Sequence, residues 1–146
     1  MIETLKQLCS IESKTFQEQE FVSYIKNRFQ NSLPDCKITE HKDSLIIQIQ
    51  PFSENKKHIC LVGHSDVVSS HFEPYTDGNL LYGAGSSDMK AALAAFVYLL
   101  ENHHKEITEK YNLSFVLYAR EEGTRLEQNG LYDLLAFDPN YFRSID

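Results

Sequence analysis

Apolar side chains recur at helical spacing near the start of the chain, where two stripes can be recognised. The first stripe has apolar residues three positions apart, at Leu5, Leu8 and Ile11. The second stripe lies within residues 16–30 and has apolar residues four positions apart, at Phe21, Ile25 and Phe29. Spacings of three and four place side chains on one face of an α-helix. The pattern therefore predicts a short helix followed by a longer amphipathic one.

Further along, the apolar pattern changes to that of β-strands. Residues 44–51 place Ile47 and Ile49 on one face of a predicted strand, which ends at Pro51. Residues 58–63 form a short, mostly apolar run between polar turns, which is typical of a strand at the centre of a sheet. These two runs predict the first strands of the domain.

The second half of the chain alternates between the two patterns. Residues 65–87 show no convincing period, and a connection of this length in a compact domain is usually functional or disordered. Residues 88–105 are rich in alanine and apolar nearly all round, which predicts a deeply packed helix. Residues 112–119 predict a strand, and residues 129–137 predict a helix that Pro139 closes. The order helix–helix–strand–strand–helix–strand–helix predicts an α/β layered domain with a mixed β-sheet flanked by helices.

Length and composition limit the number of domains, the classes of partner and the cellular compartment that fit this chain. The 146 residues fit one domain, and they carry a net charge of −7 without a polybasic patch. Nucleic acid and anionic membranes are therefore poor partners. The three cysteines (Cys9, Cys36 and Cys60) lack Cys-x-x-Cys spacing, which argues against a disulfide framework and against a thiolate zinc site. No signal-like or membrane-length apolar run is present in the sequence, so we expect a cytoplasmic protein.

Three polar clusters lie at the ends of predicted elements. GHSD (63–66) lies where one strand ends, GAGSSDMK (83–90) lies where the long helix begins, and REEG (120–123) lies where another strand ends. Ligand sites in open α/β sheets collect outside the carboxyl ends of strands, so these clusters can converge. Together they offer one imidazole and four carboxylates: His64, Asp66, Asp88, Glu121 and Glu122. Neighbouring carboxylates raise each other's pKa unless cations neutralise them, and imidazole with carboxylate is a normal zinc-binding set.

Each of these residues also has an ordinary structural interpretation. By itself, His64 is typical of a half-buried histidine at the end of a strand. Asp66 is typical of a turn residue that accepts backbone hydrogen bonds. Asp88 suits the first turn of a helix, where acidic groups are favoured. Glu121 and Glu122 suit a solvated loop. The joint order and spacing of the clusters, rather than any single residue, favours the metal site.

The joint arrangement resembles the co-catalytic di-zinc metallopeptidase family, which contains aminoacylases, acetylornithine deacetylase, carboxypeptidase-G-type enzymes and succinyl-diaminopimelate desuccinylase. The matching segments are LVGHSDVV, DGNLLYGAGSSDMKAALAAF and FVLYAREEG, and with the N-terminal LKQLCSIESKT the similarity spans essentially the whole chain. The short loop after DVV and the LYGAGSSDMK segment are closest to the desuccinylase branch. The resemblance implies a zinc-dependent hydrolase of a small N-acyl amino-acid amide in lysine and diaminopimelate biosynthesis.

The resemblance also implies roles for the clustered residues. His64 would ligate the first of two zinc ions, Asp88 would bridge both, and Glu122 would ligate the second. Asp66 would orient His64 through its other ring nitrogen, and Glu121 would be the general base. The peptide bond after Asp88 would be cis, and Co²⁺ would be able to replace Zn²⁺.

The chain also departs from the family pattern. Ala84 stands where the family usually has arginine, Ser69 and Ser70 replace a frequent proline, and tryptophan is absent. Family members carry a further acidic ligand, a lid and dimerisation domain, and a final histidine ligand, all of which would follow Asp146. We therefore expect residues 1–146 to be the N-terminal part of an incomplete catalytic domain without its lid, interrupted where a strand would follow and leaving an exposed sheet edge. It would bind zinc weakly and turn over little substrate.

Three alternatives remain open at this point. The chain can belong to another amide hydrolase on the same scaffold, such as an acetylornithine deacetylase or an aminoacylase. It can also be a non-catalytic, truncated remnant. A small acidic binding module without a metal site would require the three motifs to be coincidence.

Overall fold

The computed structural model describes residues 1–68 and 70–146, so the departure from the family pattern at Ser69 lies outside the described residues. The seven predicted elements are all confirmed. They are α1 (Ile2–Ser10), α2 (Gln19–Ser32), β2 (Ser44–Gln48), β3 (His58–His64), α3 (Lys90–Thr108), β6 (Asn112–Tyr118) and α4 (Gly130–Phe137). Elements that the sequence pattern missed are β1 (Lys37–His41), the hairpin β4 (Tyr75–Asp77) and β5 (Leu80–Tyr82), a short 3₁₀ helix (Leu126–Gln128) and α5 (Pro139–Arg143).

The main sheet is mixed, as predicted, with the strand order β1-β2-β6-β3. β2 pairs antiparallel with β1 and with β6, whereas β3 and β6 run parallel. The expectation that residues 58–63 form a central strand is wrong, because β3 lies at an edge of the described sheet and β6 lies inside it. The exposed fractions of the side chains agree, since Ile59 and Val62 of β3 are 37% and 39% exposed. An apolar run does not by itself distinguish an edge strand from a central one.

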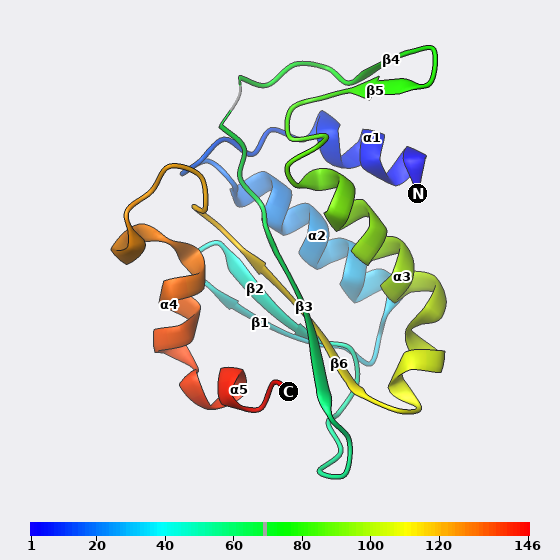
Figure 1. Cartoon of the computed structure of the whole chain (residues 1–146), viewed down its shortest axis with the longest axis vertical. Helices are drawn as coiled ribbons and strands as arrows, with labels where there is room; N and C mark the ends of the chain where they lie inside the picture. The colour runs from blue at the N-terminus through cyan, green and yellow to red at the C-terminus, as the bar shows by residue number, and fades with distance from the viewer. Residues whose placement is uncertain (69) are drawn as a thin grey trace.

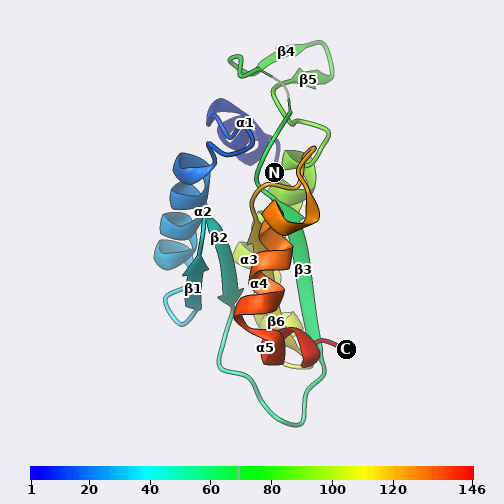
Figure 2. The same cartoon turned by 90° about the vertical axis from the view of Figure 1, so that its left-hand side faces the viewer.

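Helices cover the two faces of this sheet unequally (Figures 1 and 2). α2 and α3 pack on one face and, with α1 packed against α3, enclose the larger core, which includes Phe29, Leu93 and Phe115. α4 and α5 pack on the other face over a smaller core that includes Val116 and Tyr141. The expectation of a deeply packed α3 holds for one side of the helix only, because Leu93, Val97 and Leu100 are buried whereas Tyr98 is 44% exposed.

The parallel pairing of β3 with β6 determines where the polar clusters lie. His64 is opposite Tyr118 in the register, so the carboxyl ends of both strands lie at the same end of the sheet. The turns that follow these two strands, and the turn that precedes α3, therefore come together there (Figure 1). No helix within the described ranges is both long enough and apolar enough to cross a membrane.

Candidate metal centre

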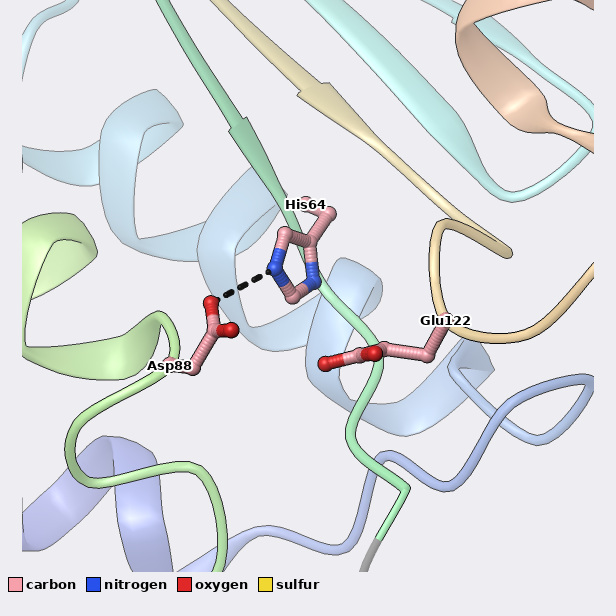
Figure 3. A group of neighbouring side chains, drawn as sticks. All are labelled: His64, Asp88 and Glu122. Carbon is pink, nitrogen blue, oxygen red and sulfur yellow. Dashed lines mark hydrogen bonds and ion pairs between the residues drawn. The ribbon is translucent and has the colours of Figure 1, made fainter.

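Three side chains from separate segments meet at the carboxyl ends of β3 and β6. His64 ends β3, Asp88 precedes α3, and Glu122 lies in the turn after β6. Each offers one ligand atom, and these atoms all lie within 4.8 Å of one another. Figure 3 shows the three side chains pointing toward a common space between their segments. The structure thus brings together the three residues for which the sequence predicts metal ligation.

The imidazole of His64 is buried, and both of its nitrogens face oxygen atoms. Nδ1 lies 3.0 Å from the backbone carbonyl oxygen of Asp66 and 3.5 Å from that residue's Oδ1. Nε2 lies 3.1 Å from Oδ1 of Asp88. Asp66 thus contacts the ring nitrogen through which the resemblance implies that it orients His64, and the shorter contact comes from its backbone carbonyl rather than its carboxylate. In a neutral imidazole that donates from Nδ1, Nε2 is left as the metal-binding atom.

The charges around His64 change its protonation. Burial alone would lower the pKa of the imidazole, but the neighbouring Asp66 and Asp88 outweigh it and raise that pKa to about 9. Burial has the opposite effect on a carboxyl group and raises the pKa of Glu122, although the charge of His64 opposes this shift. The site is therefore rich in negative charge, and a proton on His64 partly neutralises it in the protein without a cation.

The carboxylate of Asp66 holds the turn that carries the two glutamates. Its Oδ1 accepts the backbone N–H of Glu121 at 2.9 Å, and its Oδ2 accepts that of Glu122 at 2.9 Å. Oδ2 also accepts the hydroxyl of Thr15 at 2.9 Å. Although burial raises the pKa of Asp66, the contact with His64 and these hydrogen bonds outweigh burial and lower it. Acceptance of backbone hydrogen bonds is the ordinary structural interpretation that the sequence offered for Asp66, and here it occurs together with the contact to His64.

The predicted general base, Glu121, is exposed and lies outside the group of three ligand atoms. It is next to Glu122 in the same turn, and its charge is one of those that raise the pKa of His64. All five predicted site residues therefore lie in one region. The ligand atoms of His64, Asp88 and Glu122 lie within 4.8 Å of one another. Asp66 contacts the ring of His64 and the backbone of both glutamates, and Glu121 is next to Glu122 in the chain.

The turn before α3 is tightly folded around Asp88. The peptide bond from Asp88 to Met89 is cis, as the resemblance implied. Gly85 has a φ of +73°, and a Cβ there would lie 2.3 Å from Val67 Cγ1, so this position requires glycine. The Asp88 side chain itself is 76% exposed, and together with Glu122 it borders an open pocket of about 380 Å³.

A larger hollow, of about 610 Å³, lies near the C-terminal end of α3 and contains none of the predicted site residues. Its lining includes Leu33, Gln50 and His104 from segments that hold no group of metal-ligating side chains among the described residues. The group formed by His64, Asp88 and Glu122 therefore lies outside the larger hollow.

Sequence comparison agrees with the geometry of the site. The family described as Peptidase family M20/M25/M40 matches residues 60–145, which is more than half of the chain. A succinyl-diaminopimelate desuccinylase of Wolbachia pipientis wMel is 29% identical over 99% of this chain, and one of Rickettsia prowazekii (strain Madrid E) is 30% identical over 91%. The alignments cover 38% of each of these relatives, so the chain spans well under half of their length.

Solved structures show the same fold. The dipeptidase Dug1p from Saccharomyces cerevisiae matches 99% of this chain and 36% of its own, with a TM-score of 0.75 and 16% identity. Human carnosine dipeptidase 1 also matches 99% of this chain and 36% of its own, with a TM-score of 0.74 and 17% identity. At these identities, the likeness establishes the fold of the chain.

Proposed function

The chain belongs to peptidase family M20/M25/M40, and on that premise we propose that residues 1–146 form the N-terminal part of the catalytic domain of a metal-dependent amide hydrolase. The observation that carries the proposal is the convergence of His64, Asp88 and Glu122, whose ligand atoms lie within 4.8 Å of one another. These residues come from three segments far apart in the sequence. An acidic surface patch without a metal would not need an oriented, buried imidazole at its centre.

The donor set fits a divalent cation. His64 presents Nε2 toward the carboxylates because Asp66 engages Nδ1. Imidazole and carboxylate together suit Zn²⁺, and Co²⁺ takes similar ligands. In this proposal His64 would hold the first of two zinc ions, Glu122 would hold the second, and Asp88 would contribute to both. Divalent cations bound there would polarise the amide carbonyl of a substrate and make an attacking water molecule more acidic.

The residues of this chain would then handle the proton. Glu121 is the general base in this proposal: its carboxylate takes a proton from the attacking water as the carbon–oxygen bond forms. The same carboxylic acid returns that proton to the amide nitrogen as the carbon–nitrogen bond breaks, which yields a carboxylic acid and an amine. The product acid then passes its proton to the amine, which gives a carboxylate and an ammonium group. The backbone of the turn that carries Glu121 is held by the hydrogen bond from its N–H to Asp66, and Glu121 is next to Glu122, which lines the pocket.

The names of the relatives support a particular substrate. We propose hydrolysis of N-succinyl-LL-2,6-diaminopimelate to succinate and LL-2,6-diaminopimelate, a cytoplasmic step of lysine and diaminopimelate biosynthesis, because both relatives named above are succinyl-diaminopimelate desuccinylases. Acetylornithine deacetylation or aminoacylase activity on the same scaffold is the alternative. We also propose that a longer protein containing this domain supplies the remaining ligands, a lid and a dimer interface.

The activity is tested by following succinate release in the presence of added Zn²⁺. We expect slow release from N-succinyl-LL-2,6-diaminopimelate, far below the roughly 1–1,000 turnovers per second of ordinary enzymes. The release should require Zn²⁺ and should be lost in Glu121→Gln. Faster deacylation of N-acetylornithine would favour the alternative substrate. Release that neither chelator nor Glu121→Gln affects would contradict the proposed mechanism.

A further inference from the structure

The connection between α1 and α2 touches every segment that contributes to the candidate metal centre. We call residues 11–18 the connecting segment; none of its residues is among the predicted ligands or bases. Figure 3 shows His64, Asp88 and Glu122 on three separate segments of the ribbon. Their relative positions therefore depend on non-covalent contacts, and the connecting segment makes one or more contacts with each of the three loops.

The first contact is with the loop that carries Asp88. Lys90, two residues later, is 1% exposed, and its Nζ donates to the backbone carbonyl oxygen of Ile11 at 2.8 Å. The same ammonium group lies 4.8 Å from the centre of the Phe21 ring, at the start of α2. A buried lysine needs such partners because an unpaired charge in the core is costly. The start of α3 is thereby tied to the connecting segment.

The second contact is with the residues that follow β3. The N–H of Val67 donates to the carbonyl oxygen of Ser13 at 2.9 Å, and Lys14 and Val67 form an isolated parallel bridge. The hydroxyl of Thr15 donates to Oδ2 of Asp66 at 2.9 Å. The connecting segment thus runs beside the exit of β3 and supports the carboxylate that holds the glutamate turn.

The third contact is with the glutamate turn itself. Glu18 is fully buried, and its Oε1 accepts the backbone N–H of Arg120 at 3.0 Å. With the two bonds to Asp66, three consecutive N–H groups, those of residues 120, 121 and 122, point at two buried carboxylates. Arg120 has a φ of +58°, a left-handed conformation that a residue with a side chain keeps only when its surroundings enforce it.

Glu18 has a simpler interpretation as the N-cap residue of α2, but its contacts do not support it. The side chain makes no capping hydrogen bond to that helix. The side chain reaches instead to the N–H of Arg120, 102 positions along the chain. Burial of a carboxylate is costly, and a cap would function equally well with an exposed aspartate or serine.

We infer that Glu18 and Thr15 are positioning residues: through Arg120 and Asp66 they set the backbone of the turn that presents Glu121 and Glu122. The consequence for cation binding rests on the proposed function, whereas the positioning of the turn does not. The test therefore has one readout without a metal and one with it.

The first readout is amide hydrogen exchange of residues 120–122 in the metal-free protein. Glu18→Ala removes the acceptor, and we expect the exchange of these amides to accelerate by about tenfold or more. Glu18→Gln retains an acceptor oxygen of the same length and should remain within about threefold of the parent. Glu20→Gln, an exposed acid in the first turn of α2, is the matched control and should change nothing.

A second variant covers the case in which Glu18→Ala does not fold. Valine has nearly the same shape as threonine but lacks the hydroxyl, which in the parent protein donates to the Asp66 oxygen that accepts the N–H of Glu122. In Thr15→Val we therefore expect faster exchange at Glu122 than at Arg120. If folded Glu18→Ala and Thr15→Val both exchange like the parent protein at residues 120–122, the inference is overturned. If only distant amides accelerate, the two residues contribute to general stability and the inference is likewise wrong.

The second readout is the affinity for Zn²⁺, measured by calorimetry on the same variants. We expect Glu18→Ala to weaken binding by about tenfold and Glu18→Gln to restore it to within about threefold of the parent. A parent protein that binds no Zn²⁺ would refute the proposed function, and the exchange measurement would still decide the positioning role. Normal Zn²⁺ affinity in a Glu18→Ala protein whose turn exchanges rapidly would overturn the link between the turn and the site.

Discussion

Replacing Asp66 by asparagine tests how the buried carboxylate organises the site, because the two side chains have nearly the same shape. The carboxylate is 1% exposed and accepts the N–H groups of Glu121 and Glu122 and the hydroxyl of Thr15. An asparagine amide has only one acceptor oxygen. Whichever way it is turned, its NH₂ group faces one of the two backbone N–H groups, which then loses its acceptor in a buried position.

The magnitude follows from these contacts. A hydrogen bond to a charged group contributes about 1.5–3 kcal/mol, and a buried donor without a partner costs about 1–3 kcal/mol. Asp66 also raises the pKa of His64, so the variant loses part of the stabilisation of the protonated imidazole. We expect the free energy of unfolding at pH 7 to fall by about 2–4 kcal/mol, a large share of the total for a domain of this size. The midpoint of thermal unfolding should fall by roughly 10 °C.

Urea unfolding of the metal-free protein, with Asp77→Asn as control, measures this difference. Asp77 lies in β4 and is exposed, so its replacement should change the free energy of unfolding by no more than about 0.5 kcal/mol. The pKa of His64, followed by NMR, should fall in Asp66→Asn. If Asp66→Asn loses less than about 1 kcal/mol and leaves the pKa of His64 unchanged, our account of the turn is wrong.

Three further predictions concern pH, the approach of α4 to the sheet, and the smaller core. The folded-state pKa of His64 is about 9, above the usual 6.5, so the stabilisation from its charge is fully present below about pH 6.5 and is lost as the pH rises through 9. Over this range, urea unfolding of the metal-free protein should show a free energy of unfolding that falls by about 3 kcal/mol relative to that of His64→Gln. Gly130→Ala would place a Cβ 2.4 Å from the backbone oxygen of Ala119, so we expect a loss of about 1–3 kcal/mol in chemical denaturation. Tyr141→Phe removes the hydroxyl that donates to Ser114 at 2.6 Å and should lower the free energy of unfolding by about 1 kcal/mol, measured in the same way, without affecting Zn²⁺ binding.

The elements that the sequence predicted are those with a strong apolar period, and the missed strand β1 shows the limit of that signal. β1 is an edge strand with largely polar residues, and none of its residues is fully buried. It is joined to β2 by a two-residue turn in which Lys42 and Asp43 have φ values of 44° and 58°. Such turns usually carry asparagine and glycine, so Lys42 and Asp43 do not predict a hairpin.

The predicted ligand residues were recognisable because they lie at or close to the ends of predicted elements, whereas the residues that contact their loops were not. Thr15 lies 51 positions from Asp66, and Glu18 lies 102 positions from Arg120. Neither belongs to a spacing pattern, because its partner is determined by the packing of the connecting segment against the sheet edge. The misplacement of β3 has a related cause: apolar residues predict a strand, but its neighbours depend on the register of the whole sheet.

The most direct test of the central claim is a calorimetric titration of the metal-free chain with Zn²⁺, repeated with His64→Gln, Asp88→Asn and the control Asp77→Asn. If the three segments form a cation site, the parent protein and the control will show weak but saturable binding. His64→Gln and Asp88→Asn will each abolish it while the far-ultraviolet circular dichroism stays unchanged. No saturable binding by the parent protein, or equal binding by all four proteins, would contradict a metal site at His64, Asp88 and Glu122.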